Sequence, residues 1–593
     1  MPACRTASPA CLKNWGGILL VITILLAPFT AIAEDTGSLF IQQRLEQLYF
    51  EEQDKIGQER IYAASYLLDL YRKNQFQLLW TSQDNISQLL AAIIASAEEG
   101  LIPDDYHLKA ITLYGNELKE TSSRAKLVEY DLLLSDALIL LGQHKRYGKV
   151  ASHEVEDKNN VEPSPPRSSP CDIYLSAIKT GAVQATLDKR SPDHQAYLNL
   201  KQALTQYRKF AGNGGWQQIP AGPSLKPGMR DDRVPLIRKR LAITGDYHHK
   251  VPNDAAYFDD TLVAAVKSFQ TRHHLEPDGV VGKTVNTAMN VPVTERINQI
   301  RVNLERTRWV IDDMPSSSLI VDIAGFMLQY YHQNKLIWSS KVMVGQPFHQ
   351  TPIFRSTVTY LVLNPTWTIP PDIAKNETVP HISADTTYLN KQHLRVIDSS
   401  GAEVNPTAIP WKQYLGKHFP YTLRQDPGVD NSLGLIKFLF PNPYHVYLHD
   451  TPSKSLFGRA QRAFSHGCIR AQHPLELGKM LIANDPGNPT TVEKIDQIIA
   501  SGKTTTVILK QPLPIFLMYL TANVQDGAVL FKPDLYSRDQ GIFTALNGPP
   551  TPLTQTTQIS EVRGQATTLA DKNNSVPPNR CARGLDPYAK DTL

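Results

Sequence analysis

"SLIVDIAGFMLQYYHQNKLIWSSKVMVG" (Ser318–Gly345) decides the fold class of the C-terminal half of this chain. Apolar and polar residues alternate along it, break at a turn near Asn334, and then alternate again. A period of two indicates half-buried strands, so the stretch predicts a β-hairpin. The pattern returns in "TVTYLVLNPTWTIPP", "GLIKFLFPNPYHVYLHD" and "TTTVILK". We therefore expect a mainly β domain over residues 317–540, with a partly helical insertion at about 373–421 and a helix that begins at Pro474.

The N-terminal part of the chain has a different periodicity. From Leu39 to Tyr147 apolar residues recur every three or four positions, which predicts a helical scaffold domain over residues 34–224. The Gly- and Pro-rich "GNGGWQQIPAGPSLKPGMRDD" then marks a boundary. Short helices and a tight turn follow in a compact unit over 225–291, in which Asp259 or Asp260 would cap a helix. The expected fold class is multidomain α+β.

The two ends of the chain carry segments of other kinds. Residues 1–33 combine basic residues, the apolar run Ile18–Phe29 and the small-residue pattern Ala31–Ala33, which predicts an export signal. An uncleaved membrane anchor is the alternative, because the apolar stretch is nearly long enough to span a bilayer. Residues 547–593 are rich in Pro, Thr, Asn and Gln, and we expect a disordered tail there.

Charge and cysteine content narrow the classes of partner and compartment. With 61 basic against 57 acidic residues the net charge is only +4, so no nucleic-acid partner is predicted. Export would leave Cys171, Cys468 and Cys581 in a compartment that permits disulfides, and an odd number leaves at least one thiol free. Cys171 and Cys581 lie in Pro-rich segments that we expect to be loose, whereas Cys468 lies in a dense motif. Cys468 is therefore the better candidate for the free thiol.

The motif "AFSHGCIR" (Ala463–Arg470) holds the candidate chemistry. A thiol attacks as thiolate, so an activated Cys468 needs a neighbouring base or positive charge. His449 lies nineteen residues upstream at the end of a predicted strand, and His466 lies two residues before the cysteine. Either imidazole could be the base. Asp450 or a backbone carbonyl could orient His449.

Other residues of the motif suggest supporting roles. Arg470 adds a fixed positive charge, and Gly467 allows the backbone to approach a substrate. The N–H groups of Gly467 and Cys468 could point at a developing oxyanion. A buried structural cysteine and a zinc site are the competing interpretations. His445 and His449 would lie about 13 Å apart on a strand, too far to share one ion, so we expect no metal.

These residues resemble a known family. "HDTPSKSLFGRAQRAFSHGCIR" is similar to the signature of the L,D-transpeptidase (YkuD-type) catalytic domain. "FDDTLVAAVKSFQ" and "DGVVGKT", within 225–291, resemble the small peptidoglycan-binding domain. Together with the signal and the helical scaffold, the arrangement resembles the large periplasmic branch of the family.

The resemblance implies an acyl transfer on the tetrapeptide stems of peptidoglycan, without a cofactor. Cys468 would form a thioester and release D-alanine, and an amine of a neighbouring stem would resolve it into a 3–3 cross-link. His449 would act as base and acid, and carbapenems would acylate the thiol. The remaining assignments are support or oxyanion binding by Ser465, His466, Gly467 and Arg470, and walls of the substrate cleft by Trp367 and Tyr447.

Several functions remain open at this point. The same site could use water as acceptor, as an L,D-carboxypeptidase, or a protein amine, attaching a lipoprotein to the wall. A non-catalytic wall-binding scaffold is a third alternative. We also hypothesise that the insertion at 373–421 caps the cleft and excludes water. The expected location is the periplasm, free or anchored to the inner membrane.

Overall fold

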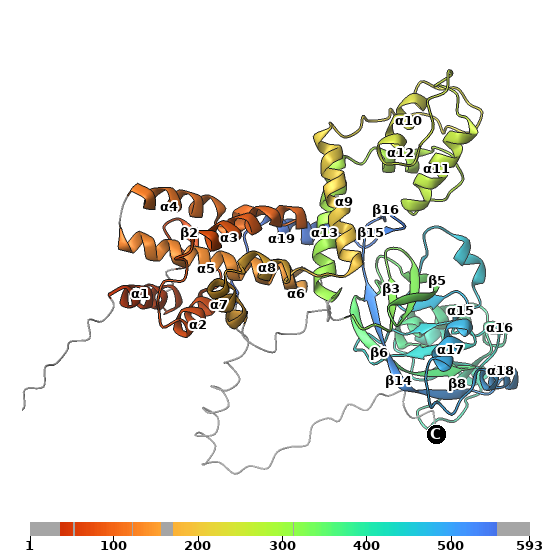
Figure 1. Cartoon of the computed structure of the whole chain (residues 1–593). Helices are drawn as coiled ribbons and strands as arrows, with labels where there is room; N and C mark the ends of the chain where they lie inside the picture. The colour runs from red at the N-terminus through yellow and green to blue at the C-terminus, as the bar shows by residue number, and fades with distance from the viewer. Residues whose placement is uncertain (1–35, 51–53, 121–122, 156–169, 312–313, 554–593) are drawn as a thin grey trace, which may run out of the picture.

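The computed structural model describes residues 36–50, 54–120, 123–155, 170–311 and 314–553. It has a helical part, a small three-helix unit and a large β sheet with its own helices (Figure 1). The predicted multidomain α+β class is therefore confirmed. The predicted export segment lies outside the described residues. Within them, no helix combines the length and the apolar character needed to cross a bilayer.

The helical part is organised around α5 (Arg124–Tyr147), whose residues from Asp131 to Lys145 are all buried. A helix that is buried on every side lies at the centre of a bundle rather than on its surface. The helices that pack on it are α1 (Thr36–Phe50), α2 (Ala64–Lys73), α3 (Gln83–Ala95), α4 (Leu108–Glu120), α7 (Pro170–Thr180) and α8 (Val183–Asp188). The short pair β1 (Lys55–Ile56) and β2 (Glu59–Arg60) precedes α2, and α6 (Ser152–Val155) packs on α19 (Asp539–Asn547).

Cys171 differs from its expected setting. It lies in α7, its side chain is fully buried in the core of the helical part, and its Sγ contacts the Tyr66 carbonyl at 3.4 Å. The Pro-rich composition before it predicted a loose segment, but the apolar contacts of α7 with α2 and α5 fix this part of the chain. Cys581 lies outside the described residues.

The three-helix unit has an independent core. It comprises α10 (Val234–Ile243), α11 (Asp260–Arg272) and α12 (Lys283–Met289) around Leu241, Val266 and Phe269. The Asp259 carboxylate accepts a hydrogen bond from Leu262 N at 2.9 Å, so Asp259 is the N-cap of α11.

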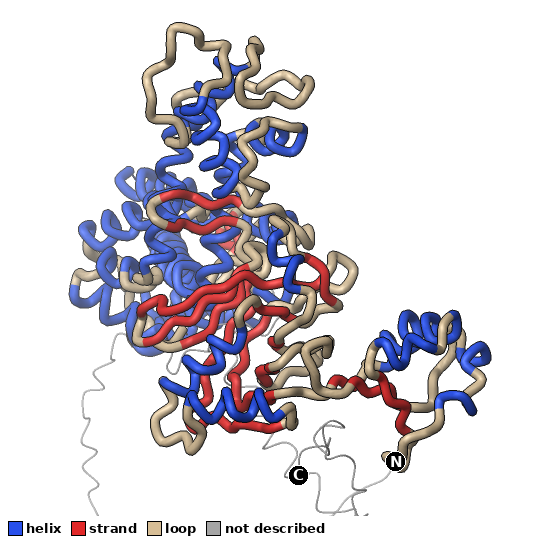
Figure 2. Tube along the Cα trace, turned by 90° about the vertical axis from the view of Figure 1, so that its right-hand side faces the viewer, coloured by secondary structure: helices blue, strands red, loops and turns tan. Residues whose placement is uncertain are grey.

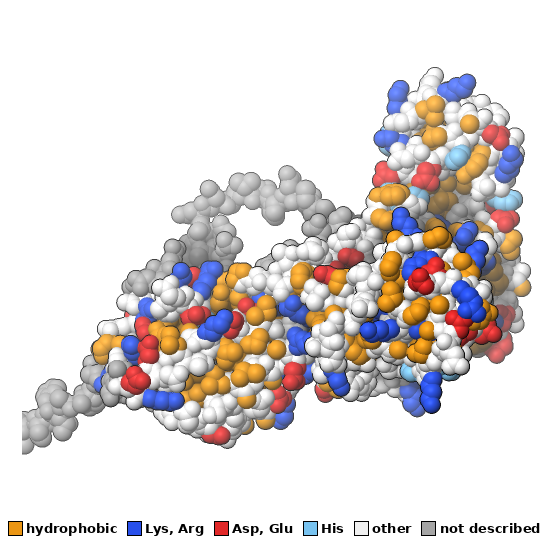
Figure 3. All heavy atoms as spheres, turned by 90° about the horizontal axis from the view of Figure 1, so that it is seen from above, with side chains coloured by type: hydrophobic (Ala, Val, Ile, Leu, Met, Phe, Trp, Pro, Cys, Tyr) orange, Lys and Arg blue, Asp and Glu red, His pale blue; other side chains and the backbone are white. Residues whose placement is uncertain are grey.

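Two long helices join the three parts of the molecule. The helices α9 (Gln195–Gly212) and α13 (Val293–Val310) lie side by side between the helical part and the three-helix unit (Figure 1). On the face seen in Figure 3, basic and acidic side chains are interspersed among apolar ones.

The large sheet has nine strands in the order β12-β5-β13-β11-β10-β6-β14-β3-β4, and an additional β4–β5 pairing closes it on itself. The predicted hairpin of the opening stretch is β4–β5, paired from Met327↔Lys341 to His332↔Lys335. The strands are β3 (Ser318–Asp322), β4 (Met327–His332), β5 (Lys335–Gly345), β6 (Phe354–Leu363), β10 (Ile436–Leu439), β11 (Leu448–His449), β12 (Ala463–Ser465), β13 (Ile469–Ala471) and β14 (Thr505–Met518).

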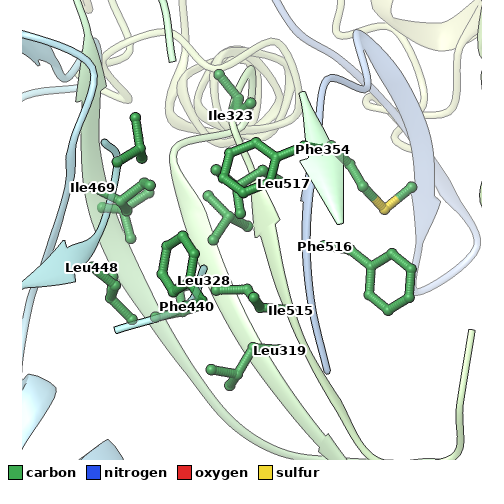
Figure 4. Close-up of a cluster of buried hydrophobic side chains, with 14 of the residues drawn as sticks. Leu319, Ile323, Leu328, Phe354, Phe440, Leu448, Ile469, Ile515, Phe516 and Leu517 are labelled. Carbon is green, nitrogen blue, oxygen red and sulfur yellow. The ribbon is translucent and has the colours of Figure 1, made fainter. Parts of the chain in front are cut away.

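Apolar side chains fill the inner face of this sheet. In Figure 4, Leu319, Phe354, Leu448, Ile469 and Ile515 approach one another from separate strands. Helices α17 (Pro474–Ala483) and α18 (Val492–Ser501) pack on β10 and β6. A Cβ at Gly478 would lie 2.6 Å from Ile436 Cδ1, so this glycine permits the close approach of α17 to β10.

The segment predicted as an insertion forms a small lobe that stands out from the large sheet (Figure 2). It has its own core, which includes Val379, Val396 and Leu423. Its elements are β7 (Trp367–Thr368), α14 (Pro371–Ile373), α15 (Val379–Ala384), α16 (Thr387–Lys391), β8 (Leu394–Ile397) and β9 (Thr422–Gln425), with the sheet order β7-β9-β8. We call this segment, Trp367–Gln425, the insertion lobe.

After β14 the chain returns to the helical part. The hairpin β15 (Ala522–Gln525) and β16 (Ala528–Phe531) packs on α9 and α11, and α19 (Asp539–Asn547) packs on α13. Beyond α19, Leu553 N donates to the Tyr62 carbonyl at 2.7 Å. Residues 554–593 of the predicted tail lie outside the described residues.

Candidate active site

The candidate residues come together on the outer face of three adjacent strands. In register, Lys437 of β10 lies opposite His449 of β11, and His449 lies opposite Arg470 of β13. Tyr447 and Cys468 directly precede β11 and β13, where Ile469 N donates to the Tyr447 carbonyl at 3.0 Å and Cys468 contacts Tyr447. The alternation of side chains along an extended chain sets them on the same face as His449 and Arg470. The intervening Leu448 and Ile469 point into the core. The sheet therefore presents two neighbouring rows, one of Arg470, His449 and Lys437 and one of Cys468 and Tyr447.

Cys468 lies at the turn that enters β13, and its thiol is partly exposed. Its Sγ contacts the His445 carbonyl at 3.9 Å and the backbone N–H and side chain of Tyr447. Burial raises the pKa of the Cys468 thiol, and the Tyr447 N–H, Lys437 and Arg470 partly oppose this rise. In the resting site the sulfur is thus a thiol, which needs a base to become a nucleophile.

His449 has the geometry of such a base. Its Nδ1 lies 2.5 Å from the Asp450 carbonyl oxygen, and since a carbonyl only accepts, Nδ1 carries the proton. Burial, with Arg470 as a second cause, lowers the pKa of His449 to about 3, so the ring is neutral and its Nε2 is an acceptor. The Asp450 carboxylate instead binds Lys454 and Leu435 N. The backbone carbonyl, and not the carboxylate, orients the imidazole.

Ser465 fixes the turn before the cysteine. The buried Ser465 Oγ donates to the Cys468 carbonyl at 2.6 Å and accepts from Gly467 N at 3.1 Å. The expectation that Gly467 N–H points at an oxyanion is therefore wrong, because this N–H is bonded to Ser465. Gly467 has φ +113°, a conformation that favours glycine. Within the described part of the chain, Cys468 N–H has no hydrogen-bond acceptor.

A second set of hydrogen bonds, made by Thr351 and Tyr536, also holds this turn. Buried Thr351 donates from Oγ1 to the Gly467 carbonyl at 2.8 Å and accepts from Gly345 N at 2.9 Å. Tyr536 OH donates to the Gly345 carbonyl at 2.7 Å. Tyr536 is far from the motif in sequence, and sequence reasoning assigned neither Thr351 nor Tyr536 a role at the site. Their hydroxyls carry no local signal of such a role.

His466 faces the insertion lobe. Its Nε2 lies 2.7 Å from Glu377 Oε1, and its ring lies 4.9 Å from that of His349. Glu377 and His349 are thus the partners of His466 within the described residues, whereas His449 lies opposite Arg470 in the strand register, and Arg470 is two residues from Cys468. Trp367, predicted as a cleft wall, packs half-buried against the core of the insertion lobe.

Two cations complete the outer face. The Lys437 ammonium lies 3.9 Å from the centre of the Tyr447 ring, and the Arg470 guanidinium influences both Cys468 and His449. Sequence reasoning missed Lys437. The signal was a lysine at an alternate position of the otherwise apolar strand "LIKFLF".

A separate cleft of about 790 Å³ lies beside the site. It is bounded by Glu276 of the three-helix unit and by Ser455, Leu456, Gly458, Arg459, Ala460, Gln461 and Phe464, and Cys468 is not among its lining residues. Within the described residues, no three His, Cys, Asp or Glu side chains gather in an arrangement suited to a metal ion.

Family comparisons agree with this architecture. Residues 316–493 match the YkuD family, described as the L,D-transpeptidase catalytic domain. Residues 65–204 match a scaffold domain and residues 230–289 match the "Putative peptidoglycan binding domain". The resemblance drawn from the Ser-His-Gly-Cys-Ile-Arg motif is confirmed.

One curated relative and two solved structures are similar to the chain. A Haemophilus influenzae protein named "Putative L,D-transpeptidase" is 34% identical over 294 residues, which are 49% of this chain and 58% of the relative. The chain thus spans just over half of that relative. An L,D-transpeptidase from Mycobacterium smegmatis is 13% identical, with 34% of this chain and 58% of that chain covered and a TM-score of 0.17.

The second structure, an L,D-transpeptidase (Yku) from Stackebrandtia nassauensis, is 13% identical over 50% of this chain and 97% of that chain, with a TM-score of 0.20. Structural similarities with TM-scores this low carry no information about the geometry of the site. The matched families, in chain order, are those of the three parts seen in the fold. The chain carries a YkuD L,D-transpeptidase catalytic domain at residues 316–493, preceded by a scaffold domain and a peptidoglycan-binding domain.

Proposed function

We propose that this protein is a cysteine L,D-transpeptidase that forms 3–3 cross-links between peptidoglycan stems. The observation that carries the proposal is the strand register, which sets His449 opposite Arg470, two residues from the partly exposed Cys468. The His449 ring is neutral, and its Nδ1 proton is held by the Asp450 carbonyl. A base with a free Nε2 next to a thiol is the minimum that thioester chemistry needs. The peptidoglycan-binding domain supports the wall polymer as substrate.

In the first half-reaction, the Cys468 proton passes to His449 Nε2, and Sγ attacks the carbonyl carbon that precedes the terminal D-alanine. The Cys468 N–H is the candidate donor to the oxyanion. The carbon–nitrogen bond then breaks, and His449 returns the proton to the departing amine. The products are free D-alanine and a thioester on Cys468.

In the second half-reaction, the side-chain amine of a neighbouring stem attacks the thioester carbon. His449 takes a proton from this amine, the carbon–sulfur bond breaks, and the thiolate is reprotonated. An amide cross-link and the resting enzyme result. Acylation of the same thiol by carbapenems follows from the same chemistry.

The acceptor decides between this function and its nearest alternatives. Water in place of the amine would give an L,D-carboxypeptidase, and a protein amine would attach a lipoprotein to the wall. The contact between Glu377 of the insertion lobe and His466 of the motif supports a cap over the site. A cap excludes water and so favours an amine as the acceptor.

The predicted export segment and the wall-binding unit support a periplasmic setting. In such a setting the donor stems, the acceptor amines and the peptidoglycan-binding domain meet in one compartment. Anchoring to the inner membrane through residues 1–33 is the alternative to a free protein, as proposed from the sequence.

The test is product analysis with defined muropeptides. The purified protein and its Cys468→Ala variant are incubated with tetrapeptide-bearing muropeptides, and the products are identified by mass. We expect dimers that have lost one D-alanine with the wild type and none with the variant. Trimmed monomers alone would assign the carboxypeptidase function. Products that form equally with both proteins would remove the enzyme proposal.

A further inference from the structure

The outer face of the sheet places two cations around the nucleophile. Arg470 and Lys437 flank His449 in register, one on each neighbouring strand, and adjacent strands lie about 4.8 Å apart. Arg470 also lies two residues from Cys468 on the same face, about 7 Å along the strand. The two cations thus lie on both sides of the base and close to the thiol.

Arg470 has an unsatisfied donor. The carboxylate of Asp450, which follows His449 in the chain, binds Lys454 and Leu435 N. In the described part of the chain, no carboxylate pairs with Arg470, and its buried Nε has no hydrogen-bond partner. A buried guanidinium N–H without an acceptor costs free energy, which a ligand that supplies the acceptor would recover.

The substrate of the proposed function supplies such an anion. On the leaving side of the scissile bond the tetrapeptide donor has only one residue, D-alanine, which ends in a carboxylate. One residue spans at most about 3.5 Å, so this carboxylate must lie close to the attacking sulfur. Lys437 and Arg470 lie on the same face of the sheet as Cys468. Their side chains are long enough to reach the D-alanine carboxylate of a donor bound at the sulfur.

We propose that Lys437 and Arg470 form a carboxylate-binding subsite that recognises the terminal D-alanine of the donor stem. The inference rests on the proposed transpeptidase function and names the chemical feature by which the site selects its donor. Lys437 is held for this role by its contact with the Tyr447 ring. A guanidinium and an ammonium that converge on a carboxylate form charge-assisted hydrogen bonds, which are the stronger class.

The subsite would act on acylation only. The D-alanine carboxylate leaves with the first product, so the thioester that remains has no group in the subsite. While the donor is bound, the carboxylate also offsets the two cations, which in the empty site lower the pKa of His449 together with burial. Binding of the correct donor would therefore make proton transfer from Cys468 to His449 more favourable.

The test compares two donors that differ only in the charge of the C-terminal group. One is a tetrapeptide with a free terminal carboxylate, and the other is its D-alaninamide. We expect Lys437→Met to lower kcat/KM for the free acid by about 10- to 100-fold, the range of one charge-assisted hydrogen bond. The kcat/KM for the D-alaninamide donor should change little in Lys437→Met. Lys437→Arg should retain most of the wild-type activity on the free acid. The rate at which an amine resolves the preformed thioester should not change.

Controls separate this proposal from the function on which it rests. Lys479→Met removes a lysine of α17 that pairs with Asp496, away from the outer face, and should leave both donors unaffected. Near-ultraviolet circular dichroism verifies that Lys437→Met is folded. If the wild type consumes neither donor, the proposed function fails. If the wild type consumes both, and Lys437→Met slows both donors equally or neither, the subsite is wrong while the function stands.

Discussion

The state of two side chains, the Cys468 thiol and the His449 imidazole, decides the chemistry of this site. The thiol is protonated because burial raises its pKa, and the imidazole is neutral because burial lowers its pKa to about 3. A thiol with a raised pKa is a poor nucleophile by itself. The site therefore depends on proton transfer within the substrate complex rather than on a preformed ion pair.

This state predicts an unusual pH profile at the residue scale. A group with a lowered pKa loses its proton early, so His449 is available as a base at every pH above about 4. The thiol stays protonated until the pH exceeds its ordinary value. We expect kcat/KM to be flat between about pH 5 and 8, with no inflection near 6.5, as measured with the tetrapeptide donor.

The control for this profile is His449→Gln, which keeps a polar side chain but no base. It should lose about 10²- to 10⁴-fold in kcat at all pH values in this range. An acid limb with a midpoint near 6.5 in the wild type would show that an ordinary imidazole controls the rate, and it would contradict the assignment to buried His449.

The sequence indicated those site residues that lie in a recognisable local pattern. The motif itself indicated Cys468, and the end of a strand indicated His449. The sequence did not decide whether the Asp450 carboxylate or a backbone carbonyl orients the His449 imidazole. The 2.5 Å contact of Nδ1 with the Asp450 carbonyl supports the carbonyl, since the Asp450 carboxylate binds Lys454 and Leu435 N instead.

At the scale of elements, the insertion lobe meets the catalytic motif through a single described ion pair. Glu377 lies in the segment Ala374–Thr378, and its carboxylate reaches His466, the residue two positions before the nucleophile. Both side chains are partly exposed, so the pair is worth only about 0.2–1 kcal/mol. Such a contact is suited to a cap that opens and closes.

Removal of this pair should change the fate of the thioester. We expect Glu377→Gln to raise the ratio of hydrolysed monomer to cross-linked dimer by about 1.4- to 5-fold, because an open cap admits water. The ratio is measured by mass analysis of the muropeptide products. Asp385→Asn removes a second carboxylate of the same lobe, which pairs with Lys391, and should leave the ratio as in the wild type. Equal ratios in all three proteins would argue against a capping role.

At the scale of the whole molecule, α13 attaches the catalytic domain to the scaffold. Fully buried Arg308 donates to Glu305 at 2.8 Å, to the Glu99 carbonyl at 2.6 Å and to the Tyr197 hydroxyl at 2.7 Å. Glu305 in turn accepts from Val150 N at 2.6 Å. One guanidinium thus connects α13 with the Ser96–Glu99 segment and with α9.

Arg308→Met tests this attachment. The variant leaves the buried Glu305 carboxylate without its cation, so we expect the free energy of unfolding to fall by about 3–5 kcal/mol. Urea unfolding followed by circular dichroism measures the loss, and limited proteolysis should show earlier cleavage around α13. The double variant Arg308→Met/Glu305→Gln should recover part of the stability. A single variant as stable as the wild type would show that apolar packing alone holds the scaffold.

The sequence by itself predicted most of the elements and indicated the candidate nucleophile. Alternation along Ser318–Gly345 indicated the β4–β5 hairpin, although the turn between β3 and β4 was not predicted. A periodicity of three to four indicated the scaffold helices, and the pair Asp259 and Asp260 indicated a helix cap, which the structure assigns to Asp259. Each of these features depends on near neighbours in the chain. Only the tertiary structure decided the partners of the site, among them Lys437, Thr351, Glu377 and Tyr536. These residues are brought to the site by strand pairing and by contacts between segments far apart in the chain. Interactions between such distant positions produce no periodic pattern in the sequence.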